Sequence, residues 1–166
     1  MCSSSLANLC CMHFHCAVAS PESNFFSFAA CSTIFPANAE ALADLRVSHV
    51  TVTVCAVDPE IGGRIYAWVR DGERRLVGRA AGEHILSAQR AGIEALVKLG
   101  VMVKINTIVV PGVNEHHAEQ VARETSALGA SLFNCLPMRP VTGTPFGTLQ
   151  EPPRELIQNL RKACEH

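Results

Sequence analysis

The sequence predicts an α/β protein in which parallel strands alternate with helices. Runs of β-branched and apolar residues occur three times, and each is followed by a segment whose apolar residues have helical spacing. Strands that alternate with helices in this way form parallel β-α-β units with right-handed crossovers. Three such strands cannot close a barrel, but they can form part of one. We therefore expect a partial parallel (β/α) barrel.

A change in composition near residue 45 divides the 166-residue chain into two regions. All 14 Lys and Arg residues lie at or after Arg46, and all 11 Gly residues lie at or after Gly62. The first region holds five of the eight Cys residues. We expect residues 1–45 to be an irregular leader, disordered or non-homologous, and residues 46–166 to form the partial barrel.

Composition and charge argue against several classes of protein. The formal net charge of −1 does not favour a binder of nucleic acid. A hydrophobic content of 48% with 17% charged residues argues against disorder over most of the chain. No apolar run is long enough to span a membrane. No C-x-x-C pair occurs, and the expected setting is the reducing cytoplasm.

Residues 6–20 are the part of the leader that most resembles a targeting signal. They end in the small-x-small triplet Ala17-Val18-Ala19, but no basic residue precedes them, which favours an irregular leader over a signal peptide. Thiolate and imidazole side chains in this segment offer a metal site as an alternative, although their spacing is not that of known zinc sites. These side chains are Cys10, Cys11, His13, His15 and Cys16.

The first strand is expected over residues 47–54, which are β-branched and mostly apolar. A helix follows, because Asp58 can cap free backbone N–H groups and Pro59 suits the first helical position. Apolar residues at helical spacing, ending with Trp68, extend this helix to about Arg70.

A turn at Asp71-Gly72 and an exposed basic connection over residues 74–79 are expected next. A longer helix then covers residues 81–99 and ends at Gly100. The second buried strand is expected over residues 101–110.

The last part of the chain repeats this alternation. Asn114 is expected to cap a helix that Gly129 ends, and residues 131–136 form the third strand. A loop rich in Pro and Gly leads to a last helix over residues 153–164. His116 and His117 point about 100° apart on a helix, so they cannot chelate one ion together, and we expect both to be exposed.

Functional residues in parallel α/β folds lie at the carboxyl ends of strands and in the loops that follow. This rule selects Thr53, Cys55, Asp58, Asn106, Thr107, residues 111–115, Asn134, Cys135, Met138 and Arg139. Simpler roles suit some of them: Asp58 and Asn114 as helix caps, and Cys135 as a small core residue. Asn106 is an amide inside an apolar strand and must find hydrogen-bond partners, so it could face a ligand. No complete catalytic motif occurs.

Three phrases carry a resemblance to a known family. They are VSHVTVTVCAVDPEIGGRIYAWVRDG, VKINTIVVPGVNEHHAEQVA and NCLPMRPVTGTPFG, in this order. Together they closely resemble the NifB family of nitrogenase cofactor biosynthesis proteins, which are radical S-adenosylmethionine (SAM) enzymes. The resemblance runs from about Ala41 to His166 without an obvious gap.

The resemblance implies an incomplete parallel (β/α) barrel, of which this chain would supply about the C-terminal half. It implies the fusion of two 4Fe–4S clusters with insertion of a carbide derived from SAM, which forms the precursor of the nitrogenase cofactor. The implied cofactors are SAM and 4Fe–4S clusters. The implied partners are iron–sulfur cluster donors and nitrogenase assembly proteins, with no nucleic acid or membrane. Open barrel edges would also favour association.

By the same resemblance, Thr53, Cys55, Asn106, Val110 and Asn134 are expected on the face that binds SAM or a cluster, with no catalytic residue and no metal ligand. Two departures from the family matter. The C-x-x-x-C-x-x-C loop of radical SAM enzymes is absent, and Cys55 stands where the family usually has Asn. We therefore expect a fragment that is inactive alone. The alternatives are a partner-binding half-barrel and an unrelated barrel enzyme such as an aldolase, which the lack of a strand-end lysine other than Lys104 disfavours.

Overall fold

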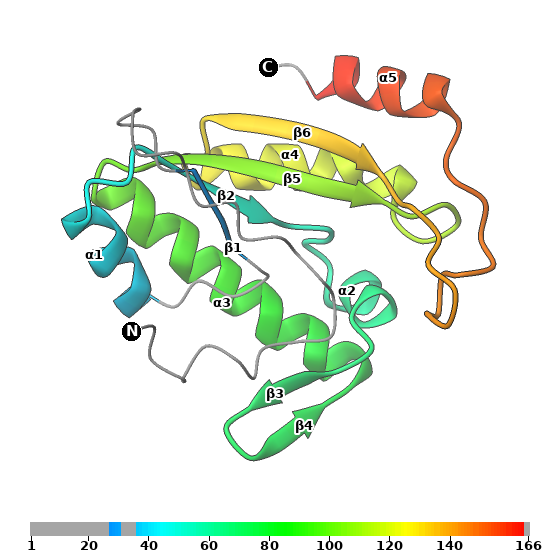
Figure 1. The fold of residues 1–166 in the computed structure, drawn as a ribbon, viewed down its shortest axis with the longest axis horizontal. Helices are drawn as coiled ribbons and strands as arrows, with labels where there is room; N and C mark the ends of the chain where they lie inside the picture. Colours follow the sequence, from blue (N-terminus) through cyan, green and yellow to red (C-terminus); the bar gives the residue numbers. More distant parts are fainter. Residues whose placement is uncertain (1–26, 31–35, 165–166) are drawn as a thin grey trace.

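The computed structural model describes residues 27–30 and 36–164 (Figure 1). Strands and helices alternate along the chain, with one antiparallel hairpin inserted. The elements are β1 (Ser27–Ala30), α1 (Pro36–Asp44), β2 (His49–Thr53), α2 (Pro59–Ile65), β3 (Val69–Asp71), β4 (Arg74–Leu76), α3 (Gly78–Lys98), β5 (Met102–Val109), α4 (Ala118–Ala127), β6 (Leu132–Pro137) and α5 (Arg154–Ala163). A short 3₁₀ turn, η1 (Glu115–His117), precedes α4.

The main sheet has the strand order β1-β2-β5-β6, and every neighbouring pair is parallel. This confirms the predicted α/β class and the parallel arrangement of the three strands expected from the sequence. The sheet does not close on itself within the described residues, where β1 and β6 are its two edges. A complete barrel therefore stays a prediction.

Two described elements, β1 and α1, fall inside the region expected to be an irregular leader. β1 pairs with β2 from Ser27↔His49 to Ala30↔Val52, and Ala39 of α1 is fully buried in the main core. A segment without Lys, Arg or Gly can still form a strand, because pairing uses backbone groups. The expected domain boundary at residue 45 stays a prediction. The proposed signal segment, residues 6–20, and the Cys and His cluster within it lie outside the described residues.

The main core lies on one face of the sheet, where α1, α3 and α4 cover β2 and β5 (Figure 1). Alternate strand residues point into it, and they are almost fully buried: Val50, Val52, Val103 and Ile105. They meet Ile93 and Leu96 of α3 and Val121 of α4. The core thus follows from the period of two along a strand combined with the apolar stripe of each helix.

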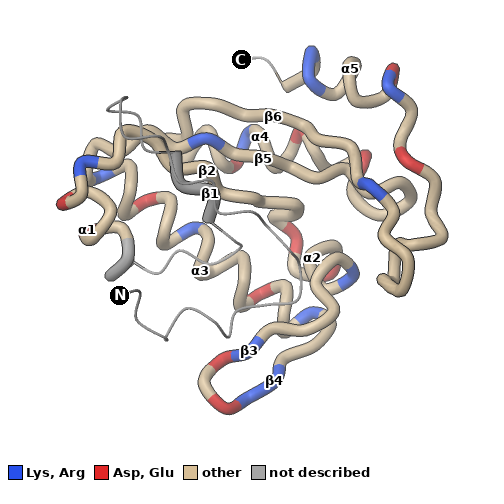
Figure 2. Tube along the Cα trace, in the orientation of Figure 1, with Lys and Arg blue, Asp and Glu red and all other residues tan. Residues whose placement is uncertain are grey.

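The prediction of a helix extending to about Arg70 is wrong. The helix ends at Ile65 because Tyr66 takes an extended backbone conformation, with φ −94° and ψ 107°. A two-stranded hairpin, β3–β4, follows and turns at Gly72, where φ is +59°. Trp68 stacks its ring under Arg75, with 5.3 Å from the guanidinium carbon to the ring centroid. Cross-strand contact therefore replaces the helical packing that the spacing of Trp68 suggested, and the hairpin carries charges of both signs (Figure 2).

Helices α2 and α3 pack through glycines. A Cβ atom on Gly82 would lie 2.1 Å from the backbone oxygen of Pro59, and one on Gly63 would lie 2.4 Å from the backbone carbon of Gly78. Only residues without a side chain allow the two backbones to come so close. The longest helix, α3, begins at Gly78, three residues before the predicted start. Among the described helices, none combines the length and the apolar character needed to cross a membrane.

Candidate functional site

The open face of the sheet, opposite α3 and α4, carries a row of polar side chains. Thr53 of β2 pairs in register with Asn106 of β5, and Asn106 pairs in register with Asn134 of β6. Residues in register on parallel neighbours point to the same face, and all three are half-buried. Three of the five residues expected at the site therefore lie side by side. We call Thr53, Asn106 and Asn134 the polar row.

Asn106 is the central member of the polar row, and its side chain has an unmet hydrogen-bonding capacity. The side-chain oxygen Oδ1 is buried and has no hydrogen-bond partner among the described residues. Its backbone oxygen, by contrast, accepts a hydrogen bond from the Val54 N–H at 3.0 Å. A buried acceptor without a partner costs about 1–3 kcal/mol, so it favours a ligand that donates a hydrogen bond.

The other two expected residues, Cys55 and Val110, lie together just beyond the row. Both are buried in an apolar cluster at the carboxyl ends of β2 and β5, with Met138 of the loop after β6. Ile108, two residues after Asn106 on the same face of β5, packs against this cluster. The polar row is thus bordered by an apolar wall, a combination typical of small-molecule sites.

Asn114 was expected to cap a helix, and this prediction is wrong. The side chain is fully buried and makes no capping hydrogen bond. Its Oδ1 accepts from the Val110 N–H at 2.7 Å, while its Nδ2 donates to the backbone oxygens of Cys55 and Ile108, both at 2.9 Å. The amide thereby gives hydrogen-bond partners to buried backbone groups at the carboxyl ends of two strands. Asn114 therefore fixes the carboxyl ends of β2 and β5 relative to each other.

His117 was expected to be exposed, which is also wrong, whereas His116 is exposed as predicted. The His117 side chain is 5% exposed, and its Nε2 accepts a hydrogen bond from the Val57 N–H at 3.1 Å. Burial lowers the pKa of His117 below its usual value. The ring is therefore a neutral acceptor that holds the loop after β2.

Two other candidates have structural roles. Asp58 caps α2, as predicted: one oxygen, Oδ1, accepts the N–H groups of Glu60 at 2.8 Å and Ile61 at 3.0 Å. These bonds lower the pKa of Asp58. Thr107 is fully buried on the covered face, where its hydroxyl donates to the Val54 backbone oxygen at 2.7 Å. Neither side chain faces the polar row.

One contributor to the site escaped the sequence analysis. Gln89 of α3 is 2% exposed, and its Nε2 donates to the backbone oxygen of Thr53 at 2.8 Å. It thereby positions the end of β2, where the polar row begins. Gln89 lies four residues from Ile85 and from Ile93, on the buried side of α3. A polar residue on the apolar stripe of a predicted helix is the sequence pattern that could have identified Gln89.

The thiols of the described region do not suit an iron–sulfur cluster. Cys55, Cys135 and Cys164 are buried, and burial raises the pKa of each. A cluster needs thiolates, which burial disfavours. Within residues 27–30 and 36–164, no three His, Cys, Asp or Glu side chains are grouped as metal ligands would be. We therefore derive no step of a reaction through a cluster held by these residues.

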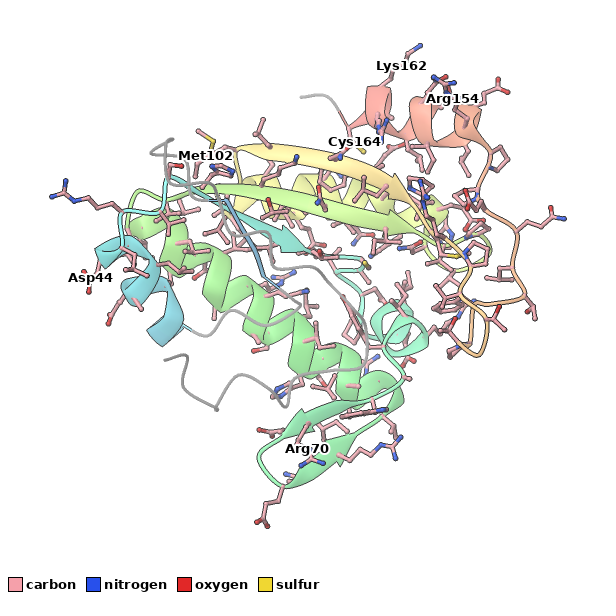
Figure 3. All side chains as sticks on the ribbon, in the orientation of Figure 1. Asp44, Arg70, Met102, Arg154, Lys162 and Cys164 are labelled. Carbon is pink, nitrogen blue, oxygen red and sulfur yellow. The ribbon has the colours of Figure 1, made fainter. Side chains whose placement is uncertain are left out.

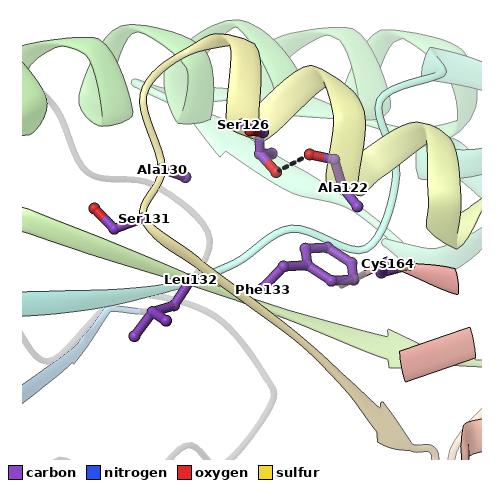
Figure 4. Close-up of a pocket in the computed structure, with 8 residues that line it drawn as sticks. Ala122, Ser126, Ala130, Ser131, Leu132, Phe133 and Cys164 are labelled. Carbon is purple, nitrogen blue, oxygen red and sulfur yellow. Dashed lines mark hydrogen bonds between the residues drawn. The ribbon is translucent and has the colours of Figure 1, made fainter. Parts of the chain in front are cut away.

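The pocket shown in Figure 4 does not coincide with the polar row. It lies between α4 and β6, and Cys164 forms part of its wall. Neither Thr53 nor Asn106 nor Asn134 lines it.

Comparison with known proteins identifies relatives that are described as FeMo cofactor biosynthesis proteins. No family model matches the chain. The FeMo cofactor biosynthesis protein NifB of Chlorobaculum tepidum is 42% identical over 123 residues, which are 74% of this chain and 29% of that protein. The NifB proteins of Klebsiella pneumoniae and Azotobacter vinelandii are 40% and 39% identical, over 79% and 78% of this chain.

These alignments cover only 29% and 26% of the Klebsiella and Azotobacter proteins, so the chain spans less than a third of the length of these relatives. Within that span, identity near 40% extends over most of the chain. Over about three quarters of its length, the chain is a NifB-family sequence that corresponds to a segment of those proteins.

Proposed function

We propose that this chain acts in the biosynthesis of the nitrogenase FeMo cofactor, as part of a radical SAM barrel whose open sheet face binds SAM at the polar row. The kinship with NifB proteins supports the pathway. The observation that carries the site is the buried, unpartnered Oδ1 of Asn106 between Thr53 and Asn134. The protein is expected to work in the cytoplasm.

The chemistry of the polar row suits a nucleoside with an amino acid attached. Oδ1 of Asn106 can only accept, and SAM offers hydroxyl and ammonium donors. Thr53 and Asn134 can both donate and accept, so they can orient the same ligand from the neighbouring strands. The apolar cluster around Cys55 and Val110 gives a surface for uncharged parts of the ligand. When bound, SAM supplies the radical chemistry of the family.

The chain alone is proposed to be inactive, because its described residues do not fit the cluster that cleaves SAM. Catalysis would then need the rest of a barrel, together with iron–sulfur cluster donors and nitrogenase assembly proteins as partners. Among the described strands, β1 and β6 are the two edges of the main sheet, and an edge strand offers backbone groups through which more strands can add. This supports a partner-binding half-barrel as the second candidate function.

Equilibrium dialysis of the full chain against labelled SAM tests the proposed site. Asn106→Leu replaces the acceptor by an apolar side chain of similar size. We expect about tenfold weaker binding, the worth of one hydrogen bond to a buried group. Thr51→Ala is the matched control, because Thr51 lies on the same face of β2 but outside the polar row. Equal affinity of the wild-type chain and Asn106→Leu would reject the site.

Anaerobic reconstitution with iron and sulfide tests the second part of the proposal. We expect no 5′-deoxyadenosine from the isolated chain, whatever its affinity for SAM. Clear turnover would show that the chain holds its own cluster and would overturn the proposed inactivity. Analytical ultracentrifugation of the same sample tests the half-barrel, since open edges predict association with rising concentration. A monomer at every concentration would count against it.

A further inference from the structure

The hairpin β3–β4 places two arginines directly opposite each other on one of its faces. Arg70 of β3 pairs in register with Arg75 of β4. The two neighbouring register pairs point to the other face of the hairpin: Val69 with Leu76, and Asp71 with Arg74. Both Arg70 and Arg75 are exposed, and the hairpin lies at the edge of the molecule (Figure 3). Because directly opposite residues have Cβ atoms about 5 Å apart, two positive side chains begin from neighbouring positions.

The charges of Arg70 and Arg75 are not matched within the chain. Like charges directly opposite each other destabilise a pair of antiparallel strands. Within the described residues, no carboxylate forms an ion pair with either arginine. Arg79, in the first turn of α3, differs from them, because its Nη1 lies 3.0 Å from Oε1 of Glu60. Since arginine stays protonated in proteins, an anion from outside the chain would relieve the repulsion between Arg70 and Arg75.

Trp68 supplies a flat aromatic surface beside the two arginines. It immediately precedes β3, and the guanidinium carbon of Arg75 lies 5.3 Å from the centroid of its ring. This cation–π contact restricts the conformations of the Arg75 side chain. A guanidinium that stacks on a ring still presents its N–H donors in its own plane. Less conformational freedom is therefore lost when an anion binds to Arg75.

We propose that Trp68, Arg70 and Arg75, here called the arginine surface, form a docking site for a protein partner that presents carboxylates. Each guanidinium can donate two parallel hydrogen bonds to one carboxylate, so two neighbouring Asp or Glu side chains of a partner match the pair. Trp and Arg are also among the residues that contribute most to binding at protein interfaces. The arginine surface is separate from the polar row and does not depend on the function proposed for it.

The charges next to the arginine surface favour a protein over a nucleic acid as the partner. Asp71 and Glu73 lie at the tip of the hairpin, where Figure 2 shows negative charge beside positive charge. These carboxylates would repel a continuous line of phosphates. An acidic patch on a protein can instead place carboxylates opposite the arginines and a cation opposite the tip. The net charge of −1 of the whole chain also does not favour binding of a nucleic acid.

Fluorescence titration of the full chain with amidated hexaglutamate tests the proposal at the site itself, because Trp68 is the only tryptophan of the chain. At about 0.1 M salt we expect a saturable change in Trp68 fluorescence, and none with amidated hexaglutamine, which has the same length without the charges. In about 1 M salt the change should disappear, because the Debye length is then about 3 Å. The anisotropy of labelled hexaglutamate measures the affinity independently.

Matched variants of the hairpin assign the binding to one of its faces. Arg70→Gln and Arg75→Gln should each weaken the binding of labelled hexaglutamate about fivefold, the worth of one exposed ion pair. Arg74→Gln is the control, because it removes the same charge from the opposite face of the same hairpin, and it should change the affinity less than about twofold.

Four results would overturn the proposal. The first is a wild-type chain that does not bind hexaglutamate, and the second is binding that leaves the fluorescence of Trp68 unchanged. The third is an Arg74→Gln variant that loses as much affinity as Arg70→Gln, which would reduce the effect to the overall charge of the hairpin. The fourth is tighter binding of hexathymidylate than of hexaglutamate, which would assign the arginine surface to a nucleic acid.

Discussion

The two faces of the parallel sheet are built from the same strands and differ in nearly every property. On the covered face, Val52 and Ile105 are at most 1% exposed and pack against α3 and α4. On the open face, Thr53, Lys104 and Asn106 are half-buried and polar, and Asn106 has an unpartnered oxygen. Since neighbouring residues of a strand point to opposite faces, one sequence can supply stability on one face and chemistry on the other.

The two ends of the sheet also differ in burial. At the amino ends of β5 and β6, Met102 and Leu132 are 48% and 53% exposed, whereas at the carboxyl ends Cys55 and Val110 are buried in an apolar cluster. The carboxyl ends are also fixed by the three hydrogen bonds of Asn114. Buried contacts are therefore concentrated beside the polar row, where a ligand would need preformed contacts.

Truncation of a buried side chain on the covered face should have the largest effect. Ile105→Ala removes a side chain that is 0% exposed in a central strand, and we expect a loss of about 4 kcal/mol in the free energy of unfolding. Lys104→Ala, its neighbour on the open face, should cost less than about 1 kcal/mol. Urea denaturation of both variants measures the difference, and similar losses would contradict the contrast between the faces.

Removal of the Asn114 amide should have the next largest effect. Asn114→Ala leaves three buried backbone groups without partners, and we expect it to cost about 2–3 kcal/mol. The control is Asn159→Ala, on the exposed side of α5, which should change stability by less than about 0.5 kcal/mol. Urea denaturation again measures both variants. A neutral Asn114→Ala would show that the strand ends are held by other contacts.

His117 predicts a pH dependence of stability. Its pKa in the folded chain lies below the usual value of 6.5, so the unfolded chain binds more protons below pH 6.5. The stabilisation is complete above pH 6.5 and is lost as the pH falls toward the folded pKa. The hydrogen bond at stake, from Val57, is worth about 1 kcal/mol.

The measurement is the unfolding midpoint in urea between pH 7.5 and 5. His117→Gln should flatten this part of the profile, and His116→Gln, at the exposed neighbour, should retain it. If His116→Gln flattens the pH profile and His117→Gln does not, the titrating group is His116. That result would refute the role given to His117.

Substitution in the polar row should have the smallest effect on stability, and it should stabilise the chain rather than destabilise it. Asn106→Leu replaces a buried unpartnered acceptor by an apolar group, and we expect a gain of about 0.5–1 kcal/mol in the unliganded chain. A thermal melt without ligand measures it, with Thr51→Ala as the reference for the same face. A loss of stability in Asn106→Leu would mean that its amide already has a partner.

The sequence predicted the strands well, because alternation and β-branched residues are local signals. The expected strands at 47–54, 101–110 and 131–136 contain or overlap β2, β5 and β6. Helices α3 and α4 end two residues before the predicted stop residues Gly100 and Gly129, both of which have positive φ. It failed for residues 66–76, where Trp68 has helical spacing but pairs with Arg75 across a hairpin. Such contacts depend on a partner strand that periodicity does not describe.

The candidate site was predicted in part for a similar reason. Strand-end rules selected Thr53, Asn106 and Asn134, which the register places side by side, because position in a parallel strand determines the edge and the face. That they bind a ligand stays a prediction. They could not assign Asn114 and His117, whose partners Cys55 and Val57 are about 60 residues away in the sequence. A helix cap and a buried bridge use the same residue types, and only the distance between elements distinguishes them.

The sequence by itself determined the alternation of strands and helices, the parallel class and the apolar face of each strand, since these depend on neighbours a few residues apart. The tertiary structure decided the register that aligns Thr53, Asn106 and Asn134, the burial of His117 and the hydrogen bonds that Asn114 makes to two strand ends. These features need segments distant in the chain to pack together, and their free energy comes from contacts that no local pattern contains.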